Sequence, residues 1–131
     1  MDDHEVVQKV KDIMHYHVGK ERAINRWELV RRVYDVTVPT SEQNDDHPLD
    51  RDIRYAVARL RAQGHFICDL GDGNGRWIAK DENEFWEFYF YYIKPIRTRA
   101  DVARSLKEAA KRKWPNILQP SLFNFDDLEV V

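Results

Sequence analysis

Five histidines and a glycine-rich run are the residues of this 131-residue chain whose types could hold a metal ion or a phosphate. His15 and His17 are two apart, so on a helix their imidazoles would point about 200° from each other and could not share one ion. His65 and Cys68 are three apart in a β-prone run, where they face opposite sides of a strand, and no second pair completes four ligands. We therefore expect no metal site.

Two other runs could bind ions but have simpler explanations. The acidic stretch from Asn44 to Asp52 lacks the spacing of a calcium loop and is typical of a helix N-cap followed by first-turn acids. The run GDGNGR at 71–76 lacks the lysine and the following helix of a P-loop, so it predicts a turn. No Ser-His-Asp set, nucleophile elbow or catalytic carboxylate pair can be assembled. The sequence predicts a protein that is not an enzyme and that needs no cofactor.

Composition narrows the class of protein further. Net charge is -2, hydrophobic residues make up 43%, and Cys68 is the only cysteine. No apolar run approaches the roughly 20 residues of a membrane-spanning helix, and the N-terminus lacks the features of a secretion signal. An intramolecular disulfide is impossible with one cysteine. We expect a cytoplasmic protein that does not enter membranes.

Hydrophobic spacing predicts three helices and a hairpin over residues 1–80. Apolar residues recur at helical spacing from about residue 5 to 18, with Gly19 as a C-cap. Asn25 and Glu28 have the spacing of a capping box at the start of a second helix of about ten residues. Residues 36–48 indicate an exposed connection, and a third helix follows from Leu49 to Gly64. The runs HFICDL and RWIAK then flank the 71–75 turn as a hairpin.

This order of elements, mainly α with a small β-hairpin, predicts a winged helix-turn-helix. Residues 81–114 predict a C-terminal helical segment that is kinked or broken near Pro95. Trp86, Ile93 and Ala100 are spaced by seven, as in a coiled-coil seam. The segment could therefore close the core of the first domain or form a homodimer through residues 85–110. Residues 115–131 lose periodicity and predict a flexible tail.

The third predicted helix is the candidate DNA-binding element. If its apolar side is buried, four residues project outward from the part that a recognition helix places in the major groove. These are Arg51, Arg54, Tyr55 and Arg59. Arg76 at the base of the hairpin could reach a phosphate, and three further cations could flank the backbone. Those are Lys20, Arg22 and Arg26.

Local charge leaves a second function open. Between Lys20 and Lys80 there are 11 basic and 10 acidic residues, and Asp50 and Asp52 stand beside the candidate arginines. Arginines on an exposed helix are often solvated or paired within the protein. The alternative is a protein-interaction module or inhibitor that uses the winged-helix fold to bind a host protein.

The run DRDIRYAVARLRAQGHFICDLGDGNGRWIAKDENE, from Asp50 to Glu84, resembles the core of small phage- and prophage-encoded winged-helix proteins. The pattern IR..V..LR..GH.IC leads there through a short wing to an aromatic-containing strand and a long C-terminal helix. The resemblance implies a DNA-binding protein that acts in replication or transcription. The long 36–48 loop and the aromatic residues of 85–96 depart from the usual compact form.

The tail contains QPSLF, which resembles the pentapeptide that attaches bacterial polymerases and repair proteins to the sliding clamp. Its pattern maps onto Gln119, Ser121, Leu122 and Phe123. A tail of this kind can insert two apolar side chains into a preformed pocket while a glutamine makes directional hydrogen bonds. The alternative is that these apolar residues pack onto the chain's own folded part.

Overall fold

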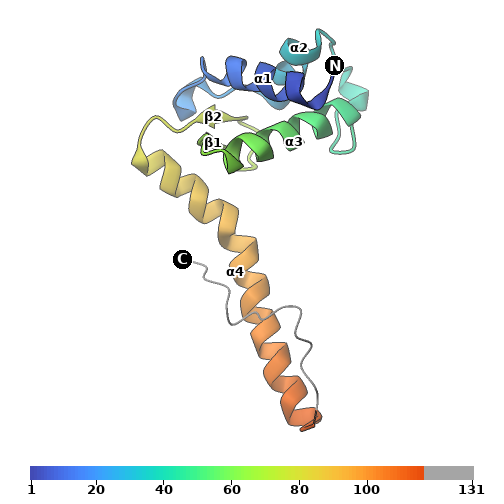
Figure 1. The fold of residues 1–131 in the computed structure, drawn as a ribbon, viewed down its shortest axis with the longest axis vertical. Coiled ribbons are helices and arrows are strands. Elements are labelled where there is room, and N and C mark those ends of the chain that lie inside the picture. The colour runs from blue at the N-terminus through green and yellow to red at the C-terminus, as the bar shows by residue number, and fades with distance from the viewer. Residues whose placement is uncertain (117–131) are drawn as a thin grey trace. The chain divides into compact units, whose positions relative to one another are not determined.

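The computed structural model describes residues 1–116 and divides the chain into two compact units, Met1–Phe88 and a second that begins at Tyr89 (Figure 1). The elements follow in this order: α1 (Asp3–Met14), the 3-10 turn η1 (Lys20–Arg22), α2 (Arg26–Tyr34), the 3-10 turn η2 (Thr40–Glu42), α3 (Pro48–Ala62), β1 (Ile67–Cys68), β2 (Trp77–Ile78) and α4 (Glu82–Lys113). The expectation of a mainly helical chain with one small hairpin is confirmed.

Each of the first three helices starts at a side chain that satisfies a free backbone N–H. Asp2 accepts from the amide of Glu5 before α1, and Asn25 accepts from the amide of Trp27 before α2, both at 2.8 Å. Before α3, His47 Nδ1 accepts from Leu49, and a proline occupies the first turn, where its missing donor costs nothing.

The core of the first unit lies where the apolar sides of α1, α2 and α3 meet. Burying these side chains supplies most of the stability available to a unit of this size. The fully or nearly fully buried members from the three helices are Val6, Val7, Val10, Met14, Leu29, Val30, Val33, Ile53, Ala56, Val57 and Leu60. The loop residues Ile24 and Val38 and the strand residue Ile67 complete this core.

The hairpin is antiparallel and is extended by a third segment of chain. Ile67 pairs with Ile78 within the hairpin. On the other side of β2, Ile24 and Arg76 form an antiparallel bridge, with N–O distances of 2.8 and 2.9 Å. The chain between α1 and α2 therefore acts as a short outer strand.

This pairing also explains where α1 ends. The apolar pattern predicts a helix to about residue 18, but α1 ends at Met14. The amide of Gly19 donates to Ile78 O at 2.8 Å, and the amide of Ile78 donates to His17 O at 2.7 Å. With these long-range hydrogen bonds, Val18 forms a parallel bridge to Ile78 of β2 and cannot continue the helix, so the predicted boundary is wrong.

The start of α4 belongs to the first unit. Phe88 is buried with Cys68 and Trp77 in a second apolar cluster beneath the hairpin. Glu84 accepts from the amides of Lys20 and Lys80, each at 3.1 Å. The compact unit consequently extends to Phe88, eight residues beyond the predicted boundary at residue 80.

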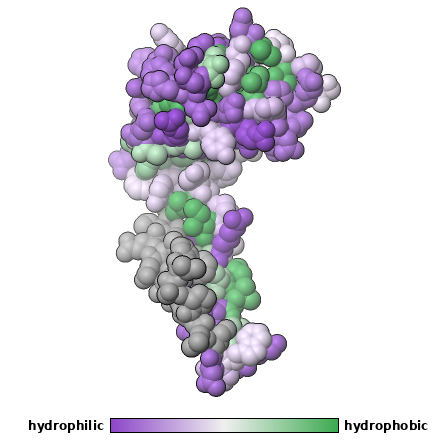
Figure 2. Space-filling view, turned by 45° about the vertical axis from the view of Figure 1, so that its right-hand side comes forward, coloured by the Kyte–Doolittle hydropathy of each residue, from purple (hydrophilic) through white to green (hydrophobic). Residues whose placement is uncertain are grey.

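Beyond Phe88 the helix α4 continues to Lys113 and runs through Pro95. Of the kink or break that the sequence predicts near this proline, the break is therefore absent. Apolar side chains lie exposed on this part of the helix, among them Ile96, Val102 and Leu106 (Figure 2). Within residues 1–116, no helix combines the length and apolar character that crossing a membrane requires.

Candidate nucleic-acid interface

Three of the predicted contact residues form one stripe on the exposed side of α3. Arg51, Tyr55 and Arg59 are each four residues apart, so they lie on one face, opposite the buried Ile53 and Leu60. All three are exposed, and the Tyr55 side chain is 70% accessible. Within the described part of the chain, neither arginine of the stripe forms an ion pair. The stripe offers two free guanidinium groups and an aromatic ring to a partner.

Carboxylates border one edge of this stripe. A hollow of about 260 Å³ between α1 and α3 is lined by Asp3 and Asp52 together with Tyr55 and Arg59. Burial, followed by the charges of Asp52 and Asp3, raises the pKa of the nearby Tyr34 hydroxyl to about 12. Asp3 and Asp52 therefore offset part of the positive charge of the stripe at this edge.

Arg26 and Arg54, which the sequence predicts as DNA contacts, are directed inward to a buried acid. Asp50 is 1% exposed, and its Oδ2 lies 3.5 Å from Arg26 Nη2 and 3.4 Å from Arg54 Nε. Arg26 also donates to Asp45 Oδ1 at 2.8 Å, and Arg54 donates to the backbone oxygen of Asp45. The two arginines thus neutralise Asp50 and tie the loop before α3 to α2.

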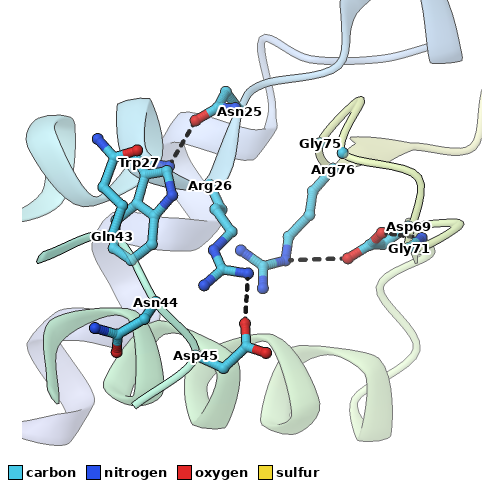
Figure 3. Close-up of a pocket in the computed structure, with 11 residues that line it drawn as sticks. Asn25, Arg26, Trp27, Gln43, Asn44, Asp45, Asp69, Gly71, Gly75 and Arg76 are labelled. Atoms are coloured by element: carbon cyan, nitrogen blue, oxygen red, sulfur yellow. Dashed lines mark hydrogen bonds and ion pairs between the residues drawn. The ribbon is translucent and has the colours of Figure 1, made fainter. Parts of the chain in front are cut away.

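Arg76 is not the exposed cation that its position at the hairpin base predicts. It is 6% exposed, because its backbone pairs with Ile24 and its side chain enters a polar cavity of about 460 Å³. In that cavity its guanidinium lies beside that of Arg26 (Figure 3), and its Nε is 4.0 Å from Asp69 Oδ2. Burial lowers the pKa of Arg76, while the charges of Asp69 and Asp50 oppose this shift.

Several buried polar atoms of the arginines that line this cavity, and of Asp50 beside Arg26, have no hydrogen-bond partner among the described residues. These are Arg26 Nε, Arg76 Nη1 and both carboxylate oxygens of Asp50. Atoms of this kind are normally hydrogen-bonded in folded proteins, to ordered water if not to other side chains. Because arginines and carboxylates balance each other here, the arrangement suits bound water and a stabilising charge network better than a phosphate.

Lys20 and Arg22 differ in whether their charges are paired within the protein. Lys20 Nζ lies 3.1 Å from Glu87 Oε1 and 5.9 Å from the centre of the Trp77 ring, so it secures η1 to the start of α4. Arg22 is exposed and forms no ion pair with any residue in the 1–116 range. Of the flanking cations predicted from the sequence, only Arg22 is placed as a free surface charge.

Sequence reasoning missed a group of cations on α4. Residues 89–113 contain 8 Lys and Arg against 2 Asp and Glu, a net charge of +6. Within the part that the structure describes, Lys94, Arg97, Arg99 and Arg112 are exposed and have no acidic partner. A charge count over short windows would have found this segment.

The remaining expectations concern metal binding, which the sequence argues against, and clamp binding by the tail. In residues 1–116, no three His, Cys, Asp or Glu side chains gather as a metal site requires. The predicted clamp-binding residues Gln119, Ser121, Leu122 and Phe123 lie outside the described residues.

Comparison of this chain with protein-family models, with curated proteins and with solved structures finds no match in any of the three. The resemblance of residues 50–84 to phage winged-helix proteins therefore stays a prediction.

Proposed function

We propose that residues 1–88 form a winged helix-turn-helix unit that binds duplex DNA through α3. The order of three helices and a hairpin supports this fold. The bridge between Ile24 and Arg76 supports it further, because it adds the outer strand that lies between the first two helices of a winged helix. In this arrangement the 71–75 turn is the wing and α3 is the reading helix.

The observation that carries the proposal is the α3 stripe. Arg51 and Arg59 are exposed and unpaired within the described chain, and they lie about 12 Å apart along the helix at 1.5 Å per residue. Guanidinium groups make bidentate hydrogen bonds to guanine or bind phosphates. Tyr55, between the two arginines, can donate or accept a hydrogen bond. Arg22 is a further exposed cation for the phosphate backbone.

An accessory role in replication or transcription, of the kind found in phage and prophage proteins, is part of the same proposal. QPSLF at 119–123 would tether the protein to the sliding clamp. Anisotropy titration of the labelled full chain with a bacterial sliding clamp tests the tether, beside a Leu122→Ala, Phe123→Ala variant. We expect saturable binding that the double substitution removes; equal binding by both chains would contradict the tether.

Binding to labelled duplex DNA of mixed sequence, measured by anisotropy at several salt concentrations, tests the role of α3. We expect Arg51→Ala, Arg59→Ala to weaken binding and to lower the slope of log K against log salt by about 2, since each lost phosphate contact removes about 0.9. Arg31→Ala, Arg32→Ala is the control with the same charge change, because these α2 arginines already pair with Glu28. Equal loss in both variants would contradict a specific role for α3.

The charge of the first unit favours a second candidate function. Residues 1–88 contain 13 Lys and Arg against 18 Asp and Glu, a net charge of -5, which opposes approach to a polyanion. Exposed aromatic groups at Phe66 and Trp86 suit a protein partner better. A module that binds a host protein would bind it with little salt dependence, and duplex DNA would leave its anisotropy unchanged.

A further inference from the structure

The second unit carries a basic surface that the winged-helix proposal does not use. The net charge of +6 on residues 89–113 contrasts with -5 on residues 1–88. A local concentration of positive charge on an otherwise acidic protein is the electrostatic footprint of a polyanion-binding segment.

Geometry places three of the free cations on one side of α4. Successive residues turn by about 100°, so Lys94 and Arg112 coincide after five turns and Arg97 lies about 60° away. All three are exposed. Two more cations on this side are occupied: Arg104 lies 3.1 Å from Asp101, and Lys111 lies 3.5 Å from Glu108.

The spacing of these cations suits the backbone of a duplex. Lys94 and Arg112 are about 27 Å apart along the helix axis at 1.5 Å per residue. A duplex carries one negative charge per about 1.7 Å of its axis, so a helix of this length meets several phosphates. Lysine and arginine at such spacing bind phosphates without reading bases.

A second copy of this chain fits the same surface less well. In the heptad defined by Ile93, Ile96 and Ala100, positions on both flanks of the seam are basic. These flanking residues are Arg97, Arg99, Arg104, Lys111 and Lys113. Two copies packed in parallel along this seam would bring like charges together, which destabilises such a pair.

We propose that α4 from Lys94 to Arg112 binds the phosphate backbone of duplex DNA as a second, sequence-independent contact. The inference rests on the proposed function, since it takes duplex DNA as the ligand. It adds phosphate contacts from α4 to the contacts that the α3 stripe makes with bases and phosphates.

The experiment compares the full chain with Lys94→Gln, Arg97→Gln, Arg112→Gln, which keeps good helix-forming residues at all three positions. Anisotropy with a labelled duplex is measured across a salt series. The control of equal charge change is Lys9→Gln, Lys11→Gln, Arg31→Gln, on exposed positions of α1 and α2. A third variant, Lys94→Arg, Arg97→Lys, Arg112→Lys, keeps the charge. Far-UV circular dichroism verifies that each variant is folded.

We expect the α4 glutamine variant to lose about tenfold or more in affinity and the salt slope to fall by about 2 to 3. The charge-conserving variant keeps the wild-type slope, and the control stays close to it. If the glutamine variant binds as the control does while Arg51→Ala, Arg59→Ala still weakens binding, this inference is wrong and the proposed function stands. If the wild-type chain does not bind duplex at all, both fail together.

Two other possible partners of this basic surface, a second copy of the chain and an anionic membrane, are tested with the same variants. Light scattering would show a dimer that dissociates in the α4 glutamine variant if a second copy were the partner. Sedimentation with phosphatidylserine vesicles would show salt-sensitive binding, without duplex binding, if an anionic membrane were the partner. Either result would overturn the assignment to DNA.

Discussion

The carboxylate of Asp50 lies 3.5 Å from the guanidinium of Arg26 and is 1% exposed, in the first turn of α3. Arg54 Nε lies 3.4 Å from the same carboxylate oxygen. A buried carboxylate is costly unless it is paired, and here the pairing joins α2, α3 and the loop between them. Arg26 and Arg54, which the sequence predicts as DNA contacts, thus stabilise the first unit.

Asp50→Ala should destabilise the protein by about 2 kcal/mol, less than a fully buried pair would lose, because Arg26 and Arg54 are partly exposed and can be solvated. The remaining cost comes from Arg76, which stays buried with less compensating charge. Urea unfolding followed by tryptophan fluorescence measures the change. Asp52→Ala, on an exposed position of the same helix, should shift stability by less than about 0.5 kcal/mol. Equal effects in both variants would show that Asp50 is not specially required.

Gly75→Ala should lower the free energy of unfolding by more than about 2 kcal/mol. Gly75 has a φ of +99°, and a β-carbon there would lie 2.1 Å from the carbonyl oxygen of Ile24. Gly73→Ala is a matched control, since Gly73 has a φ of +83° but open space around it. It should cost only the conformational strain of about 1 kcal/mol. Similar melting temperatures for the two variants would rule out a close approach at Gly75.

Glu28→Gln should reduce the amount by which the protein's free energy of unfolding falls in acid. Hydrogen bonds from Arg31 and then Arg32 lower the pKa of Glu28 from 4.5 to about 2. Its stabilisation is therefore fully present above pH 4.5 and is lost as the pH falls toward 2. Stability measured by urea unfolding across this range should vary less with pH in the variant. Glu42→Gln, on an exposed turn, should follow the wild type; a parallel change in both would assign the effect to general charge.

Cys68 should react with a thiol reagent only after unfolding. The side chain is fully buried beside Trp77, and this burial raises the pKa of the thiol to about 11. Thiolate is the reactive form, so a neutral and inaccessible thiol reacts slowly. Colorimetric titration at neutral pH should give little signal in native protein and one equivalent in urea. Adding Ser41→Cys, on the exposed loop, supplies one fast-reacting equivalent as a positive control. Fast reaction of native wild-type protein would contradict the burial of Cys68.

Local signals predicted the helices of the first unit well, because apolar periodicity and caps act within a few residues. The start of α2 illustrates both the success and its limit. Asn25 caps the helix as expected, but Glu28 does not complete the capping box and pairs instead with Arg31 and Arg32. The Glu28 carboxylate could reach either the amide of Asn25 or the two arginines, and sequence spacing alone does not show which interaction forms.

Long-range pairing caused the larger errors. The end of α1 and the burial of Arg76 both depend on hydrogen bonds between the 17–24 segment and β2, more than fifty residues away in sequence. The residues next to an arginine in the sequence do not show whether its side chain is exposed or buried. The α3 stripe could be predicted because it depends only on helical periodicity, whereas the inward direction of Arg26 and Arg54 depends on the buried Asp50.

Glu84 accepts a hydrogen bond from the amide of Lys20 and another from the amide of Lys80. One carboxylate thereby joins two loops that lie far apart in the sequence. Aspartate has the same charge but is one methylene shorter, so it could not span both amides from the same helix position. Both donors are backbone amides, which every residue except proline supplies, so the constraint falls on residue 84 and not on the side chains at positions 20 and 80.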